Sequence, residues 1–258
     1  MIRTREELSP LEELSLIDIS YSRLNTLDFC SAKYFYTYVL LEERTFGAAA
    51  TLGNVIHSAL EETEWDKPLS LSELNTLYRE RRVDYDPDRQ IDDQLIDAGY
   101  RMLSEFVDRH KDDKFDVIST EQPFHFILGN AAISGYIDRI DRGPDGTIMV
   151  IDYKSGKNEV AAKHIANDLQ LGVYALAVSL LYPEEDKIYA ELYYLRSGRR
   201  KGHLFTREDL AIVERNLLEK ISDLIETDDF KYTPNSRICS FCDFRKICPV
   251  GQKRYPNS

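Results

Sequence analysis

The segment SGYIDRIDRGPDGTIMVIDYKSGK, residues 134–157, carries the residues best suited to chemistry in this chain. Asp152 and Lys154 stand two apart at the end of an expected strand, so both side chains point to one face of the sheet. A carboxylate and an ammonium at the end of an apolar strand are costly unless they are paired or functional. Taken alone, the pattern is also that of an exposed ion pair.

Asp138, on the preceding strand, can join Asp152 only in one class of strand register. Opposed residues of an antiparallel pair have a constant sum of residue numbers, and this sum must be even for the two carboxylates to share a face. Pairing Asp138 with Asp152 and Ile140 with Val150 satisfies this condition and requires a five-residue loop at 143–147 or a bulge. The minimal GPDG turn would separate the carboxylates, so we predict the longer loop.

Two carboxylates and a lysine are the groups that metal-assisted cleavage of a phosphodiester needs. Carboxylate oxygens hold Mg²⁺ or Mn²⁺, and the cation activates water and neutralises charge on the phosphate. A lysine orients that water or stabilises the transition state. Asp138, Asp152 and Lys154 therefore predict this chemistry if the fold brings them together.

Three further candidate residues lie on predicted helices before and after this segment. His57 follows Gly53 in TLGNVIH, and Gln170 and Tyr174 lie at positions i and i+4 in QLGVY, on one helix face. A lone helical histidine is usually a surface or core residue, and Tyr174 alone would be assigned to the core.

The four cysteines form a second candidate site. Cys30 stands alone, and Cys239, Cys242 and Cys248 form a C-x2-C-x5-C run. Clustered cysteines in a chain with no visible signal peptide favour metal over disulfides. The division into one and three favours a four-iron cluster, with a tetrahedral zinc site and four unligated buried thiols as alternatives. Either metal would join the N-terminal and C-terminal regions.

Hydropathy and turn residues predict an α/β fold in which helices flank a mixed central sheet. We expect a helix over 21–39 with Cys30 inside it, and then a Gly/Ala-rich step, 47–53, that leads into a helix carrying His57 and ending near Trp65. A helical insertion at 66–116 follows. The remaining elements are three strands, a helix, two strands and a last helix, at residues 117–127, 131–141, 147–154, 160–181, 187–196, 200–205 and 207–226.

Composition narrows the class of protein. The 258 residues have a net charge of −12, which argues against a cationic nucleic-acid coat, and 11 Phe and 16 Tyr argue against disorder. With no membrane span or signal peptide in view, we expect a cytoplasmic protein. Residues 187–258 are mildly basic, and their turn at Arg199, Arg200 and Lys201 is the candidate DNA-contact surface.

The motifs G-x-x-x-H, GYIDRID, IDYKSGK, Q-x-x-x-Y and C-x2-C-x5-C follow one another in that order, after a cysteine in RLNTLDFCSAKYFY. This set resembles the RecB-type nucleases of the PD-(D/E)XK superfamily. It is most similar to the iron–sulfur subgroup, with its AddB nuclease domains and CRISPR-associated RecB-like exonucleases. The resemblance spans about residues 20–250. It implies a restriction-endonuclease-like core in a single nuclease domain over residues 1–258, with the 66–116 insertion and an iron–sulfur region formed by 237–250 with Cys30.

The resemblance also implies roles for individual residues. A Mg²⁺ or Mn²⁺ ion would be bound by three side chains and one backbone carbonyl, those of His57, Asp138, Asp152 and Tyr153. Lys154 would be catalytic, and Gln170 and Tyr174 would shape the site and contact the DNA backbone, with Glu121 as a candidate for further support. A structural [4Fe–4S] cluster would be held by Cys30, Cys239, Cys242 and Cys248.

The function implied is a metal-dependent DNA exonuclease that acts on single strands or ends, in repair, recombination or CRISPR adaptation. A helicase or a CRISPR integrase would be its partner, and no membrane is expected. One alternative is a catalytically silent scaffold of nuclease fold that binds DNA ends within a larger complex. Another is a metal-dependent phosphoesterase that acts on RNA or nucleotides.

Overall fold

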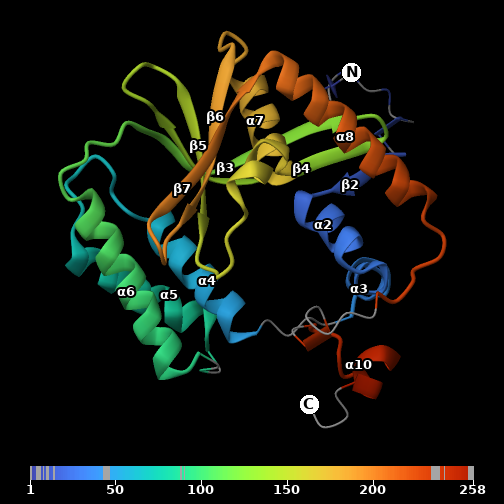
Figure 1. The fold of residues 1–258 in the computed structure, drawn as a ribbon, viewed down its shortest axis with the longest axis horizontal. Helices are drawn as coiled ribbons and strands as arrows, with labels where there is room; N and C mark the ends of the chain where they lie inside the picture. The colour runs from blue at the N-terminus through green and yellow to red at the C-terminus, as the bar shows by residue number, and fades with distance from the viewer. Residues whose placement is uncertain are drawn as a thin grey trace. The chain divides into compact units, whose positions relative to one another are not determined.

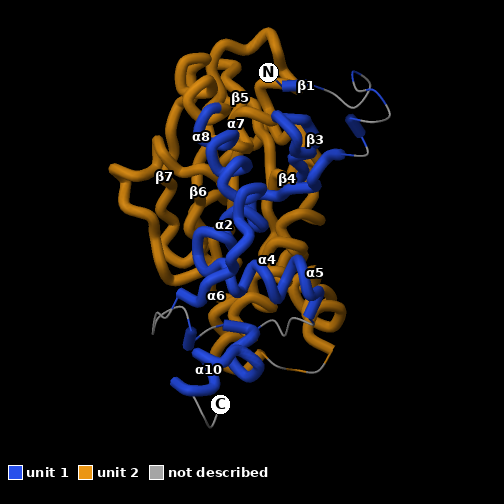
Figure 2. The backbone as a smooth tube through the Cα atoms, turned by 90° about the vertical axis from the view of Figure 1, so that its right-hand side faces the viewer, with its two compact units in different colours: residues 1–47, 125–134, 215–258 blue, residues 48–124, 135–214 orange. Residues whose placement is uncertain are grey.

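The computed structural model describes residues 2–3, 7, 9, 12–13, 15–42, 47–87, 89, 91–233, 239–240 and 242–254. The chain divides into two compact units, which are coloured separately in Figure 2. Unit 1 comprises residues 1–47, 125–134 and 215–258, and unit 2 comprises residues 48–124 and 135–214. All four cysteines fall in unit 1, and the other candidate residues fall in unit 2.

A mixed sheet runs through the described part of the chain, as the sequence predicts (Figure 1). β5 and β6 are parallel, whereas the pairs β4–β5 and β6–β7 are antiparallel. β2 pairs with β4 outside the main order β1-β3-β4-β5-β6-β7. In chain order the strands are β1 (Ile2–Arg3), β2 (Ile17–Ile19), β3 (Val117–Leu128), β4 (Ala131–Arg142), β5 (Ile148–Lys154), β6 (Lys187–Tyr194) and β7 (Arg199–Thr206).

The register of β4 and β5 confirms the pairing predicted from the sequence. Ile140 lies opposite Val150, and β4 ends at Arg142 while β5 begins at Ile148, which leaves the five-residue loop 143–147. The N–H of Gly143 closes this loop by donating to the carbonyl of Thr147 at 2.8 Å. Continued one step, the same register sets Asp138 beside Asp152.

Three helices of unit 2 share one apolar core with the sheet. They are α4 (Ala48–Glu61), α5 (Leu71–Tyr85) and α6 (Asp93–His110). Their buried side chains form a single cluster with Ile151, Tyr153, Tyr193 and Leu195 of the β5 and β6 segments. The predicted helical insertion at 66–116 is thus packed into the core of the sheet.

The predicted helix at 160–181 is divided in two. A 3₁₀ segment, η3 (Ala162–Asn167), precedes α7 (Leu169–Leu181). The carboxylate of Asp168 accepts a hydrogen bond from the N–H of Leu171 and caps α7, which fixes where this helix begins. Residues Leu171 to Val178 are buried without interruption, as expected of a helix enclosed on all sides.

In unit 1 the prediction of one helix over 21–39 is wrong. The segment is divided into α2 (Tyr21–Phe29), α3 (Ser31–Tyr34) and the π-helical η2 (Phe35–Val39). Cys30 lies between helices in an extended conformation, with φ −167° and ψ 112°. The break is held from far along the chain, because the N–H of Ala32 donates to the carbonyl of Lys231 at 3.1 Å.

Other contacts join the N-terminal helices to the C-terminal residues of unit 1. The rings of Tyr34 and Phe35 pack on Phe230, and Tyr36 stacks on Phe244. Two helices complete the described structure. They are α8 (Arg207–Glu226), which begins next to Thr206 as predicted, and α10 (Pro249–Arg254). None of the described helices combines the length and apolar character needed to cross a membrane.

Candidate active site and cysteine cavity

His57 reaches the sheet because α4 approaches the end of β5 closely. A Cβ atom at Gly53, one turn before His57, would lie 3.1 Å from Ser155 Oγ, so glycine permits this approach. His57 Nδ1 lies 3.2 Å from Asp138 Oδ2. Burial alone would lower the pKa of His57, but the hydrogen bond and the charge of Asp138 outweigh it and raise that pKa above its usual value.

A hydrogen-bond network centred on Gln170 joins β5 to α7. Lys154 Nζ lies 2.6 Å from Asp152 Oδ2 and donates to Gln170 Oε1 at 2.9 Å. Gln170 Nε2 donates to Asp152 Oδ1 at 2.9 Å and lies 3.0 Å from the hydroxyl of Tyr174. One side chain thus holds both the carboxylate and the ammonium of the D-x-K pair.

Burial governs the charges of this network. Asp152 is 2% exposed, and its burial raises the pKa of the carboxyl despite the opposing charge of Lys154. For Lys154, burial would lower the pKa, but the charge of Asp152 outweighs it and raises the pKa. The ammonium is therefore charged at neutral pH. Burial also raises the pKa of Tyr174, whose hydroxyl stays protonated.

The backbone of β5 connects the His57–Asp138 pair to the network of Asp152, Lys154 and Gln170. The N–H of Tyr153 donates to Asp138 Oδ2 at 2.8 Å, so Asp138 contacts both His57 and the residue between Asp152 and Lys154. The structure therefore brings together the predicted residues His57, Asp138, Asp152, Lys154, Gln170 and Tyr174.

Glu121 stands near this site on a strained backbone. Its φ of 43° lies in the left-handed region, which is unusual for a glutamate within a strand. Burial, with the charges of Asp138 and Glu61, raises the pKa of Glu121 to about 7. Sequence reasoning missed Glu61, although its position one turn after His57 on the same helix face was an available signal.

The donor atoms at this site fit a hard divalent cation in kind. Two carboxylates from β4 and β5 and an imidazole from α4 supply oxygen and nitrogen donors, and the buried Asp152 Oδ2 has the Lys154 ammonium as its neighbour at 2.6 Å. Across the described residues, however, no three His, Cys, Asp or Glu side chains are arranged as a metal-binding group. His57 and Asp138 contact each other, and Asp152 contacts Lys154.

The four cysteines of unit 1 line one cavity, together with Tyr36, Phe244 and the cations Lys33 and Arg245. All four thiols are free. Lys33 Nζ forms an ion pair with Asp243 at 3.1 Å, and Arg245 Nη1 donates to the carbonyl of Ser240 at 2.9 Å. Within the predicted region 237–250, residues 237, 238 and 241 lie outside the described residues.

The three basic residues predicted to contact DNA have partners inside unit 2. Arg199 and Lys201 both pair with Glu159, at 3.3 and 2.8 Å, and Arg200 pairs with the buried Glu191. Lys201 also donates to the carbonyl of Val160 at 2.7 Å. Of the three, Arg199 is the most exposed.

The sequence model of the PD-(D/E)XK nuclease superfamily matches residues 18–249. The chain belongs to this superfamily. The match includes every residue of the carboxylate site and all four cysteines. The mixed sheet with flanking helices is the core expected of a PD-(D/E)XK nuclease, as the resemblance implied.

Relatives of this chain are similar to it over part of its length. The chain is 32% identical to the Gene 69 protein of Mycobacterium phage L5 over 138 residues, which are 50% of this chain and 44% of that protein. A component of the ATP-dependent helicase/deoxyribonuclease of Streptococcus pyogenes serotype M6 is 33% identical over 103 residues, 38% of this chain and 10% of that protein. The matched regions are thus less than half of either relative.

A solved structure shares the fold over nearly the whole chain. A candidate exonuclease from Eubacterium rectale matches with a TM-score of 0.50 and 14% sequence identity, covering 92% of this chain and 97% of that one. At this identity the likeness concerns the fold alone.

Proposed function

We propose that this chain is a metal-dependent deoxyribonuclease that removes nucleotides from single-stranded DNA or from DNA ends. The observation that carries the proposal is the contact of Gln170 on α7 with Asp152 and Lys154 at the end of β5, beside Asp138 and His57. A nuclease of this superfamily needs carboxylates for a cation and a charged group for the phosphate, and both lie here within hydrogen-bonding distance of one another.

His57, Asp138 and Asp152 would hold a Mg²⁺ or Mn²⁺ ion, and the carbonyl of Tyr153 is a candidate for a further ligand. When bound, the cation would lower the pKa of a coordinated water and neutralise charge on the phosphate. Asp152 is suited to this role because its carboxylate is buried and its charge would be neutralised by the cation. Occupancy of the site would replace the internal contacts His57–Asp138 and Asp152–Lys154.

Lys154 supplies the fixed positive charge of the site. Its ammonium is charged at neutral pH and is aimed by Gln170 Oε1, so it would stabilise negative charge that develops on a phosphate oxygen. Gln170 orients Lys154 and Asp152 at once. The hydroxyl oxygen of Tyr174 accepts a hydrogen bond from the Gln170 amide. The same hydroxyl would donate a hydrogen bond to the DNA backbone.

Similarity supports DNA as the substrate and a helicase as the partner. One relative is named as part of an ATP-dependent helicase/deoxyribonuclease. We therefore favour a helicase over the CRISPR integrase that the motif resemblance also suggested. Repair or recombination is the corresponding setting.

The proposal includes a structural [4Fe–4S] cluster at the cysteine cavity. The four free thiols that line one cavity would be its ligands, although among the described residues they are not gathered into a metal-binding group, and Lys33 and Arg245 would offset part of its negative charge. Zinc is the competing metal. A brown protein after anaerobic purification, with iron and no zinc by elemental assay, is expected. A colourless protein that contains zinc would overturn the iron assignment.

The nuclease proposal is tested with the full chain, Mg²⁺ or Mn²⁺, and a panel of substrates. We expect degradation of linear single-stranded DNA, sparing of closed circular duplex and complete loss of activity with a chelator. Binding of DNA ends without cleavage under either cation would instead indicate a scaffold. Cleavage restricted to RNA or nucleotides would indicate a different phosphoesterase.

A further inference from the structure

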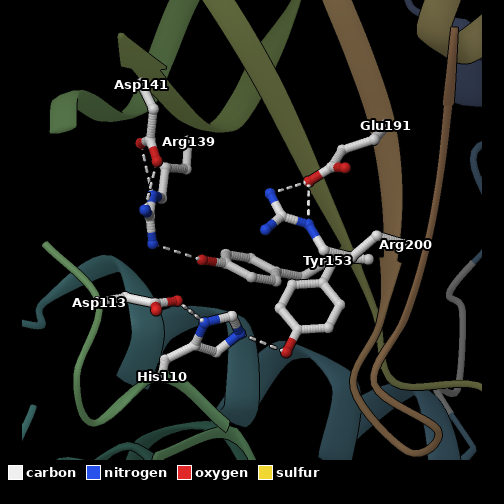
Figure 3. Close-up of polar contacts among 8 residues, drawn as sticks. His110, Asp113, Arg139, Asp141, Tyr153, Glu191 and Arg200 are labelled. Atoms are coloured by element: carbon white, nitrogen blue, oxygen red, sulfur yellow. Dashed lines mark hydrogen bonds and ion pairs between the residues drawn. The ribbon is translucent and has the colours of Figure 1, made fainter. Parts of the chain in front are cut away.

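Arg139 and Asp141 belong to the GYIDRID motif but face away from the proposed catalytic groups. They alternate with Asp138 and Ile140 along β4, so their side chains lie on the opposite face of the sheet. Arg139 is only 3% exposed, and its guanidinium forms a two-pronged pair with Asp141, with 2.6 Å between Nε and Oδ1 (Figure 3). A buried arginine in such a pair keeps its charge and a fixed direction.

Aromatic rings hold the same guanidinium in place. Its central carbon lies 3.9 Å from the ring centroid of Trp65 and 4.3 Å from that of Phe115. The pair with Asp141 and the two rings fix the orientation of the guanidinium, so that Nη1 points toward Tyr153. Nη1 donates to the hydroxyl of Tyr153 at 3.2 Å.

Tyr153 links the two faces of the sheet. Its ring is buried with Arg139, whereas its backbone N–H donates to Asp138 Oδ2 on the side of the proposed cation site. The paired register of β4 and β5 ends with Arg139 opposite Ile151, so a side chain, not a backbone carbonyl, takes the N–H of Tyr153.

Asp138, Arg139 and Tyr153 are joined in a ring by one peptide bond and two hydrogen bonds. Asp138 and Arg139 are neighbours in the chain, Arg139 binds the hydroxyl of Tyr153, and the N–H of Tyr153 binds Asp138. We propose that Arg139, acting through Tyr153, is a positioning residue that sets the direction of the Asp138 carboxylate. This inference rests on the proposed function, because the carboxylate is positioned for the cation that Asp138 would bind. Fixing a ligand before the cation arrives reduces the reorganisation that binding requires.

The chain offers a matched pair of substitutions for the test. Tyr153 and Tyr193 lie directly opposite each other on β5 and β6, and each is 3% exposed. The hydroxyl of Tyr153 contacts the buried Arg139 (Figure 3). The hydroxyl of Tyr193 contacts the buried His110 Nε2 at 2.6 Å and also the part-exposed Arg109. Tyr153→Phe and Tyr193→Phe therefore remove equivalent atoms, but only Tyr153 contacts Asp138.

Two measurements are made on each variant of the full chain. Amide hydrogen exchange at residue 153, followed by NMR in metal-free protein, reports the hydrogen bond to Asp138. Calorimetric titration with Mn²⁺ alone reports the cation site. We expect Tyr153→Phe to accelerate exchange at residue 153 and to weaken Mn²⁺ binding about tenfold. Tyr193→Phe should lower the melting temperature by a similar amount and leave both readouts at wild-type values.

Arg139→Lys gives a second route, since it keeps the charge but loses the planar fork. It should change both readouts in the same direction as Tyr153→Phe, and if it fails to fold, Tyr153→Phe still decides the matter. Equal effects in the two tyrosine variants, or unchanged amide exchange in Tyr153→Phe, would overturn the positioning role. A wild-type protein that binds no Mn²⁺ would overturn the proposed function instead, while the exchange comparison would still decide whether Arg139 positions Asp138.

Discussion

The carboxylate site of unit 2 and the cysteine cavity of unit 1 are held together in different ways. In the first, side chains on strand ends and two helices hold one another at distances of 2.6 to 3.2 Å. In the second, four thiols from two segments distant in sequence line a cavity and form no disulfide. Contacts between protein side chains therefore assemble the carboxylate site, whereas in the cysteine cavity the proposed cluster would supply the bonds that join the four thiols.

The largest expected effect is loss of catalysis at a site whose fold survives. Asp152→Asn keeps the shape of the side chain but removes its charge, and it should lower the rate of DNA degradation about 10³-fold. The melting temperature should stay close to that of the wild type, because a buried carboxylate is replaced by a neutral group. Lys154→Ala should be equally inactive, and Lys157→Ala, at an exposed position three residues on, is the control. Full activity in Asp152→Asn would refute the assignment.

A substitution in the cysteine cavity should instead lower the melting temperature. Cys30→Ala removes one of four ligands and should lower the melting temperature by about 10 °C, the size expected when about 4 kcal/mol of binding free energy is lost. Scanning calorimetry of Cys30→Ala beside Asp152→Asn measures this contrast directly. A Cys30→Ala protein that melts like the wild type would remove the distinction between the two regions.

A smaller effect concerns the pH dependence of stability. In the metal-free protein, ionisation of Glu121 should lower the free energy of unfolding at high pH. Glu121 has a pKa of about 7 in the folded protein against an ordinary value of 4.5, so the folded state binds the proton more tightly. The stability from this group is present below pH 4.5 and is lost as the pH rises through about 7. Glu121→Gln resembles the protonated form at every pH.

Thermal melts at a series of pH values test this expectation. Glu121→Gln should match the wild type in acid and exceed it by about 1 kcal/mol at pH 8, a value discounted because the carboxyl is only partly buried. Glu80→Gln, at an exposed position on α5, is the control. An unchanged difference between Glu121→Gln and the wild type at all pH values would contradict this account.

The smallest effect concerns the basic turn. Arg199→Ala breaks a pair between Glu159 and the exposed Arg199 guanidinium and should leave the melting temperature close to that of the wild type. If Arg199 contacts DNA, the slope of log affinity against log salt should fall by about one. A salt titration of binding to single-stranded DNA by the variant and the wild type measures that slope, and an unchanged slope would remove Arg199 from the DNA-contact surface.

Regular periodicities explain what could be predicted from the sequence. The shared face of Asp138 and Asp152 and the loop at 143–147 follow from the two-residue repeat of strands, and the structure confirms the register. The proximity of Gln170 and Tyr174 follows from helical spacing in the same way. Such patterns survive because they depend only on the local geometry of the chain.

Features that depend on distant partners could not be predicted. The break at Cys30 is held by the carbonyl of Lys231, some 200 residues away. The environment of Arg139 is supplied by Trp65 and Phe115, which no motif links to it. The positive φ of Glu121 has no local signal, since glutamate is not a residue that favours it.

The contacts of Ser31 and Ala32 with Lys231 have a consequence for the order of folding during synthesis. Unit 1 is completed by residues 215–258, which are synthesised after all of unit 2. Contacts of such long sequence separation form slowly, because a long loop must close first. We therefore expect the nascent chain to assemble its sheet and carboxylate site while Cys30 still awaits the other three thiols. Loading of the proposed cluster would then follow synthesis of both units.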